Sequence, residues 1–196
     1  MKKIITIVVM TIIFLTVGIS NVKAVTPTPI YSYKLIWNIE SIYYYLTPNA
    51  VKYSSYISAA ANNWVYTGYG YNKLFPNTQA GYITDSAIDF YTYSDNYTLT
   101  IAKTRWFART NVWTGTAYET YAFESDWLYS EIHINEPEFN TLSASYKQGT
   151  ITHEFGHVWG LQHNQTNPYS IMCQVASGRI VNTVQQVDND AFNSKY

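Results

Sequence analysis

Residues 152–164 of the chain read Thr-His-Glu-Phe-Gly-His-Val-Trp-Gly-Leu-Gln-His-Asn. In a helix four residues advance about 400°, so His153 and His157 point the same way one turn apart and can reach one metal ion. Gly160 can take the left-handed conformation that ends a helix, which would let His163 return to the same ion. The sequence therefore predicts a helix with two metal ligands and a loop with the third.

Glu154 follows the first of these histidines and lies about 100° further around the helix. This angle places its carboxylate within reach of a water at the metal and outside the coordination sphere. Three histidines leave one position of a tetrahedral zinc site open, which is typical of catalytic and not of structural sites. We therefore predict one zinc ion held by His153, His157 and His163, with Glu154 as the catalytic general base.

The spacing His-Glu-x-x-His-x-x-Gly-x-x-His is similar to the signature of the metzincin zinc peptidases. Met172, at the end of Tyr169-Ser170-Ile171-Met172, stands where this family places its Met-turn, an apolar floor beneath the metal ligands. The chain looks most like small bacterial matrixin-like peptidases, although Asn164 stands where matrixins usually carry Ser. The resemblance implies an α+β fold, a metzincin-like zincin with a twisted mixed sheet, an active-site helix, a Met-turn and a C-terminal helix.

The same resemblance implies a zinc endopeptidase in which Glu154 takes a proton from the attacking water and passes it to the leaving amine. It also implies that the strand before the zinc helix is a sheet edge that binds the peptide as an added strand. The substrate-binding residues would then be Ile132, His133, Ile134 and Asn135. The segment at 174–181 is expected to form the wall of the S1′ pocket.

The N-terminus has the pattern of a secretory signal peptide. Met1-Lys2-Lys3 precedes an apolar run over residues 4–18, which is shorter than the roughly 20 residues of a membrane-spanning helix. The small residue Ala24 suits a cleavage site, so we assign 1–24 to the signal peptide and 25–196 to one metallopeptidase domain. An uncleaved anchor is the alternative, and both interpretations predict a secreted or extracellular domain.

Composition and charge limit the classes of partner. Hydrophobic residues are 47% and charged residues 13% of the 196, which is typical of a folded chain. Removing the signal takes three lysines and no acid, so the net charge falls from −1 to −4, and we expect no nucleic-acid partner. Cys173 is the only cysteine, expected to be buried, so the domain must rely on its core, on metal, or on both. We expect a monomer without membrane contact.

Hydrophobic periodicity predicts the remaining elements. In the strand before the zinc helix, Ile132 and Ile134 share one face and His133 lies on the other. A capping box of Thr183 and Gln186 predicts a C-terminal helix. Strands are expected over residues 33–45, 87–91, 97–102, 116–123 and 127–135, and a further helix over about 49–65.

Alternatives to this interpretation stay open at the level of sequence. One is a secreted, zinc-stabilised domain that binds protein or glycan without turnover, since 20 residues are tyrosine. Another is a metal hydrolase that acts on a non-peptide amide. Calcium is unsupported, because acidic residues such as Asp89 lack the spacing of a calcium loop and are expected to be solvated. His133 is expected to be structural or at the rim of the site, with a second metal or a substrate contact as the alternative.

Overall fold

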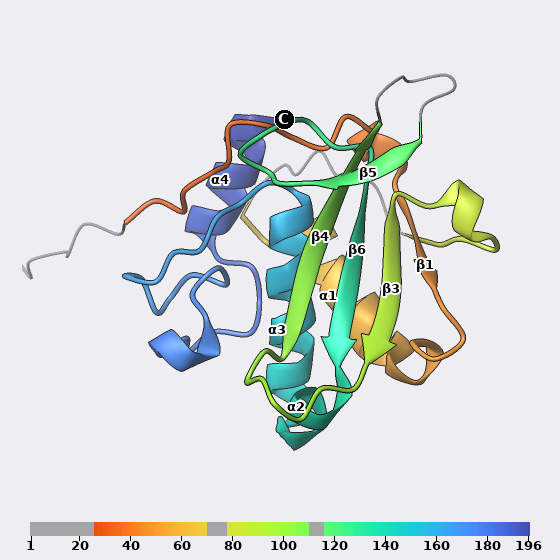
Figure 1. Cartoon of the computed structure of the whole chain (residues 1–196). Coiled ribbons are helices and arrows are strands. Elements are labelled where there is room, and N and C mark those ends of the chain that lie inside the picture. The colour runs from red at the N-terminus through yellow and green to blue at the C-terminus, as the bar shows by residue number, and fades with distance from the viewer. Residues whose placement is uncertain (1–25, 70–77, 110–115) are drawn as a thin grey trace, which may run out of the picture.

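The computed structural model describes residues 26–69, 78–109 and 116–196, so the predicted signal peptide lies outside the described residues. Its strands are β1 (Tyr43–Leu46), β2 (Thr78–Gln79), β3 (Ile88–Tyr93), β4 (Ala102–Arg109), β5 (Ala117–Thr120) and β6 (Tyr129–Asn135). They form one mixed sheet in the order β2-β1-β3-β6-β4-β5 (Figure 1). β4 is antiparallel to both of its neighbours, and the other pairs are parallel. The fold is α+β, as the sequence predicts.

The helices α1 (Ser54–Val65) and α3 (Ala144–Val158) lie behind one face of this sheet (Figure 1). The short helix α2 (Glu136–Thr141) connects β6 to α3, and α4 (Gln186–Lys195) packs its Phe192 ring against Trp64 of α1 and Trp159 at the end of α3. Single 3-10 turns occur at η1 (Ile39–Ser41), η2 (Val51–Tyr53), η3 (Ile83–Asp85) and η4 (Val175–Ser177). No helix of the described ranges has the length and apolar character needed to cross a membrane.

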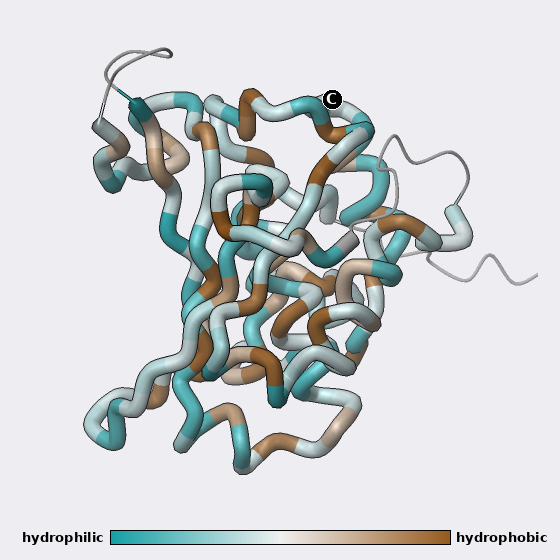
Figure 2. Tube along the Cα trace, turned by 90° about the vertical axis from the view of Figure 1, so that its right-hand side faces the viewer, coloured by the Kyte–Doolittle hydropathy of each residue, from teal (hydrophilic) through white to brown (hydrophobic). Residues whose placement is uncertain are grey.

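The core lies between the sheet and the helices behind it. Figure 2 shows apolar segments of strands and helices meeting in the interior of the molecule. Phe155 of α3 is fully buried, and its ring centroid lies 5.5 Å from that of Phe90 in β3 and 6.5 Å from that of Tyr44 in β1. Burial of a large apolar side chain stabilises a fold by about 1.5–3 kcal/mol. These contacts therefore fix α3, with its histidines, against the sheet.

Two predicted strands differ from those observed. The strand expected over 33–45 is confined to β1, because Asn38 accepts a hydrogen bond from the backbone N–H of Glu40 and turns the chain into η1. The strand expected over 97–102 begins at Ala102, since Tyr97 and Leu99 are 99% and 87% exposed and have no neighbouring strand in the described residues. Residues 97–101 alternate as a strand does, but they pair with no strand among the described residues.

The C-terminal helix is present, but its capping box lies two residues later than predicted. Gln185 and Asp188 form the reciprocal pair at the start of α4, in place of Thr183 and Gln186. Asp188 is fully buried, and its carboxylate accepts hydrogen bonds from groups outside α4 as well as from the start of the helix. The start of α4 therefore coincides with the buried carboxylate of Asp188.

The prediction that β6 is the sheet edge is wrong. β6 pairs with β3 on one side and with β4 on the other, so its backbone groups have partners on both sides. β5 pairs with β4 only from Trp106 to Arg109. The outer side of residues 102–105 therefore has no neighbouring strand in the described parts of the chain, and this is the free edge beside α3.

Candidate metal centre

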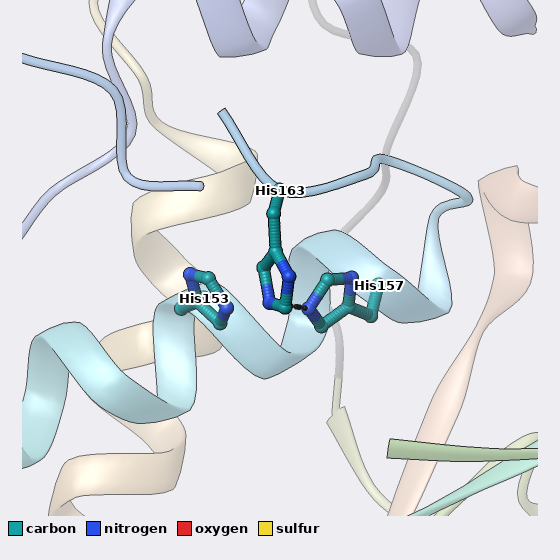
Figure 3. A group of neighbouring side chains, drawn as sticks. All are labelled: His153, His157 and His163. Atoms are coloured by element: carbon teal, nitrogen blue, oxygen red, sulfur yellow. Dashed lines mark hydrogen bonds between the residues drawn. The ribbon is translucent and has the colours of Figure 1, made fainter. Parts of the chain in front are cut away.

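Three histidine side chains converge at the C-terminal part of α3. His153 and His157 come from α3 itself and His163 from the loop that follows, and Figure 3 shows their rings around one point. One potential ligand atom from each ring lies within 4.8 Å of the others, and Nε2 of His157 lies 3.1 Å from Nε2 of His163. Among the described residues, this is the group of histidines, cysteines and acids that could hold a metal ion.

The turn that brings the third histidine back is built as the sequence predicts. Gly160 has φ +82°, and α3 ends at Val158, just before it. The Gly160 N–H donates to the carbonyl of His157, and the Leu161 N–H donates to the carbonyl of Gly156. These two bonds are the Schellman pattern that closes a helix at a left-handed glycine. The prediction for Gly160 is confirmed.

Hydrogen bonds fix how two of the rings are protonated. Nδ1 of His153 lies 2.8 Å from the carbonyl oxygen of Ile171, and Nδ1 of His157 lies 2.8 Å from that of Leu161. A carbonyl oxygen can only accept, so each Nδ1 carries the proton and each Nε2 presents a lone pair. Burial lowers the pKa of both rings, that of His157 to about 3, which keeps them neutral as metal ligation requires.

This arrangement fits a metal ion. The Nε2 lone pair of His157 faces the ring nitrogen of His163 at 3.1 Å. Two nitrogens bound at 2.0–2.1 Å in a tetrahedral site lie about 3.3 Å apart, so this spacing is close to the one that two ligands of a shared cation would have. Burial also lowers the pKa of His163, the most exposed of the three, which leaves its ring uncharged. The three rings could therefore act together as neutral nitrogen donors.

Glu154 lies beside these ligands and outside their cluster, as predicted. Its side chain is 5% exposed, and its Oε2 accepts a hydrogen bond of 2.7 Å from Oγ1 of Thr104 in β4. Burial raises the pKa of Glu154 to about 7, although the Thr104 hydrogen bond and the charge of Arg179 act in the opposite direction. Thr104 was not predicted, because its place beside Glu154 depends on a contact 50 residues distant in sequence.

Met172 packs directly on the backbone of α3. It is fully buried, and a Cβ added to Gly156 would lie 2.2 Å from its sulfur. Gly156 stands between the two helical histidines, so the thioether occupies the space that a side chain there would fill. The carbonyl of Met172 also accepts from the N–H of Asn164, next to the third histidine, at 2.9 Å. Met172 therefore touches both segments that carry the candidate ligands.

Asp188 holds the loop before Met172 in place. Its carboxylate accepts hydrogen bonds from the hydroxyls of Thr28 and Ser170 and from the N–H of Ile171. The carbonyl of Ile171 is in turn the partner of the His153 ring. Asp188 is thus two hydrogen bonds from a candidate ligand, and only its place in a helix-start pattern could have indicated it from sequence.

A cavity of about 340 Å³ opens beside His153 and Glu154. Its lining includes residues 99–102, which lead into β4, and Thr150 of α3. The lining also includes part of the segment expected at 174–181, namely Gln174, Val175, Ala176 and Arg179. Arg179 is 3% exposed and was not singled out from the sequence, because nothing local distinguishes it from a surface arginine.

The predicted substrate-binding residues of β6 do not meet the metal centre. Ile132 and Ile134 are fully buried in the core, and His133 lies on the opposite face, stacked on Tyr91 and 2.7 Å from Oε2 of Glu131. Asn135 is buried and donates to the carbonyls of residues 95 and 100, so it shapes the segment that borders the cavity. These assignments fail because β6 is an interior strand. Cys173 is buried, as predicted.

Comparison with known proteins gives a similarity of fold and no sequence match. No family model matches the chain, and no curated protein matches its sequence. Among solved structures, it is similar to a chain in the GM1-bound form of the ECX AB5 holotoxin, with a TM-score of 0.53 and 15% identity over 86% of each chain. At this identity the similarity extends to the architecture of the chain and no further.

Proposed function

We propose that the chain is a secreted zinc-dependent endopeptidase of the metzincin type. The observation that carries the proposal is the convergence of three neutral imidazoles beside a buried carboxylate. Three nitrogen ligands with a position left over are typical of catalytic zinc, and an imidazole set suits zinc better than calcium or magnesium. A buried carboxylate that follows the first ligand and lies outside the ligand group could serve as a general base toward a metal-bound water.

In this proposal His153, His157 and His163 hold the ion, which when bound supplies a Lewis acid for the peptide carbonyl and for water. Glu154 accepts a proton from the attacking water and delivers it to the leaving amine nitrogen. A pKa near 7 suits both roles, since the group can hold and release a proton near neutral pH. The Thr104 hydroxyl orients the carboxylate through its hydrogen bond to Oε2.

The peptide is proposed to bind along the free outer side of residues 102–105. This edge presents unpaired backbone groups, which an extended peptide can satisfy as an added strand. The edge borders Glu154 through Thr104 and the cavity through Ala102. The loop from Ser170 to Met172 is proposed to act as the Met-turn beneath the ligands.

The proposal is tested by comparing two variants with the wild type on casein and on a quenched peptide library, with and without a chelator. Glu154→Gln keeps the metal ligands and loses the base, so it should retain stoichiometric zinc and lose at least about 10²-fold in kcat. His153→Ala should lose zinc itself. Substantial peptide cleavage by zinc-loaded Glu154→Gln would refute the role of Glu154.

The alternatives predict different results in the same assays. A hydrolase of non-peptide amides would bind zinc and fail on every peptide. A domain that binds protein or glycan without turnover would show zinc-dependent stability and no cleavage. Its most suitable surface is the uncovered sheet face, where the ring of Tyr91 stacks on His133 and that of Phe107 on Tyr129.

A further inference from the structure

Arg179 is a buried cation that interacts with the charge of Glu154 and forms no close ion pair within the described residues. Its side chain is 3% exposed, and no carboxylate within the described ranges lies close enough to form an ion pair with it. Two of its nitrogens make hydrogen bonds of 3.5 Å, to the carbonyl of Ile171 and to Oγ1 of Thr150. Its Nε has no partner in the described residues. The guanidinium therefore keeps much of its hydrogen-bonding capacity unused.

Burying a charge without a partner is costly, and native proteins usually pair such groups or place them where a ligand arrives. Burial lowers the pKa of Arg179 to about 10, so the side chain still carries its charge at neutral pH. It lines the cavity beside His153 and Glu154. A guanidinium offers planar pairs of N–H donors, whose best partner is a carboxylate bound through both oxygens.

The rest of the cavity does not supply that carboxylate. Its other lining residues are apolar or uncharged, apart from the candidate ligand His153 and Glu154, the proposed base. Glu154 already bonds to Thr104 and forms no ion pair with Arg179. Leu99, Ile101 and Val175 can pack against the carbon chain of an acidic residue while Arg179 binds its end. The cavity thus combines apolar residues with one cation that forms no close ion pair among the described residues.

We propose that Arg179 selects substrates in which the residue after the scissile bond presents a carboxylate to this cavity. The inference rests on the proposed peptidase function and names the substrate class of that site. The carboxylate has two sources: the side chain of Asp or Glu within a longer peptide, or the C-terminal carboxylate of a substrate that ends at this residue. Arg179 acts as a specificity-determining residue in both cases.

The test uses four matched peptides and the zinc-loaded full-length mature protein. Two are internal substrates with an amidated C-terminus that differ only in Glu or Gln after the scissile bond. The other two end at that position in Gln, one with a free carboxylate and one amidated. A hydrogen bond to a charged group should raise kcat/KM by about 10-fold to 100-fold. Within the pair that responds, the peptide that carries the carboxylate should therefore have the higher kcat/KM. The pair that shows the preference identifies the source.

Variants of Arg179 show whether the preference depends on it. Arg179→Gln should bring the ratio for the preferred pair to within about twofold of unity, and Arg179→Lys should keep part of the preference because the charge remains. Arg109→Gln is the matched control, since it removes an exposed cation from the far end of β4 and should leave the ratio unchanged. Ratios are compared because Arg179 also contacts the carbonyl that supports His153, so absolute rates can fall for that reason.

Binding of product-like peptides separates failure of this inference from failure of the proposed function. Calorimetry with zinc-loaded Glu154→Gln and the tripeptide amides Glu-Ala-Ala and Gln-Ala-Ala needs no turnover, and adding Arg179→Gln should abolish a preference for the Glu peptide. Equal rates within both substrate pairs, or a preference that Arg179→Gln leaves intact, would overturn the inference while peptidase activity stands. Free glutamine and glutaminamide, compared in the same way, cover the C-terminal source. If no peptide is cleaved, equal binding within both pairs still overturns the inference, and an Arg179-dependent preference in either pair supports it.

Discussion

Thr104 and Glu154 form the contact on which the proposed chemistry depends most directly. The hydroxyl of Thr104 lies 2.7 Å from Oε2 and 3.1 Å from the backbone oxygen of Glu154, so one β4 residue joins the sheet to both parts of a helix residue. Losing this bond leaves a buried carboxylate free to rotate. Loss of the bond should then disturb the position of the Glu154 carboxylate and leave metal binding unchanged.

Thr104→Val should therefore lower kcat by about tenfold, the equivalent of a hydrogen bond to a charged group, and leave zinc content and KM nearly unchanged. Steady-state kinetics on a quenched peptide and metal analysis of the same sample measure this. Thr104→Ser is the control, since it keeps the hydroxyl and should retain most of the activity. An unchanged kcat in the valine variant would show that Thr104 does not position Glu154.

Gly156 is required for the close approach of Met172 to α3. An alanine methyl there would lie 2.2 Å from the Met172 sulfur, so Gly156→Ala should force the loop away from the helix. Overpacking of this kind costs about 1–3 kcal/mol, or roughly 2–12 °C in Tm for a domain of this size. Calorimetry of the zinc-loaded protein checks it. Gly81→Ala is the matched control, because nothing lies within 4 Å of its added Cβ, and equal Tm losses would contradict the packing argument.

At the scale of single elements, local patterns predict what local forces decide. The two candidate ligands of α3 and the turn at Gly160 follow from helix geometry and from one left-handed residue, so both could be predicted from the sequence. The strand expected over 97–102 is misplaced because the alternation of residue types only assigns side chains to two faces. It does not show whether a neighbouring strand is present. Thr104 and Arg179 were missed because their importance comes from contacts with Glu154 and its cavity, which lie far away in sequence.

β3 contains an acid that the sequence suggested would be solvated and that the structure buries. Asp89 is 5% exposed, accepts a hydrogen bond from the hydroxyl of Ser86, and shares a cavity with Glu131 and Arg109. Burial first, and the charge of Glu131 to a smaller extent, raise the pKa of Asp89 to about 6, against the effect of Ser86. The folded protein therefore holds this proton more tightly than the unfolded chain does.

Because the folded pKa is the higher one, stability from this group is fully present below about pH 4 and is lost as the pH rises through about 6. The loss should amount to about 1–3 kcal/mol. Asp89→Asn should remove it, so the variant gains stability relative to wild type between pH 4 and pH 7. Urea unfolding of both proteins at the two pH values measures the difference. Parallel pH dependence of the two would contradict the assignment.

At the scale of the whole molecule, the order of the strands decides where the proposed peptide substrate would bind. The alternation of residues 129–135 correctly places Ile132 and Ile134 on one face and His133 on the other, yet it could not tell an interior strand from an edge. That distinction depends on β4, which lies antiparallel between β6 and β5. β5 covers only Trp106 to Arg109, so the outer side of residues 102–105 has no neighbouring strand in the described parts of the chain. Strand order is a property of the complete sheet, which no single segment encodes.

Metal removal should destabilise the whole molecule. The chain has one cysteine and so no intrachain disulfide, which leaves the metal as the cross-link between α3 and the loop that carries His163. A ligand present at about 1,000 times its Kd adds about 4 kcal/mol, so a chelator should lower Tm by on the order of 10 °C. Scanning calorimetry with and without chelator measures this shift. His163→Ala should show no shift, and a reducing agent should change nothing in either protein. An unaltered wild-type Tm would argue against a bound metal.

The first described residues are hydrogen-bonded to the last parts of the chain. The N–H of Tyr31 donates to the carbonyl of Gly160, and the N–H of Gln162 donates to that of Pro29, beside the third histidine. The hydroxyl of Thr28 reaches Asp188 in α4. During synthesis the leading segment must therefore wait for nearly the entire polypeptide before it finds its partners. A nascent or prematurely terminated product would therefore lack the contacts that hold the loop carrying the third candidate ligand.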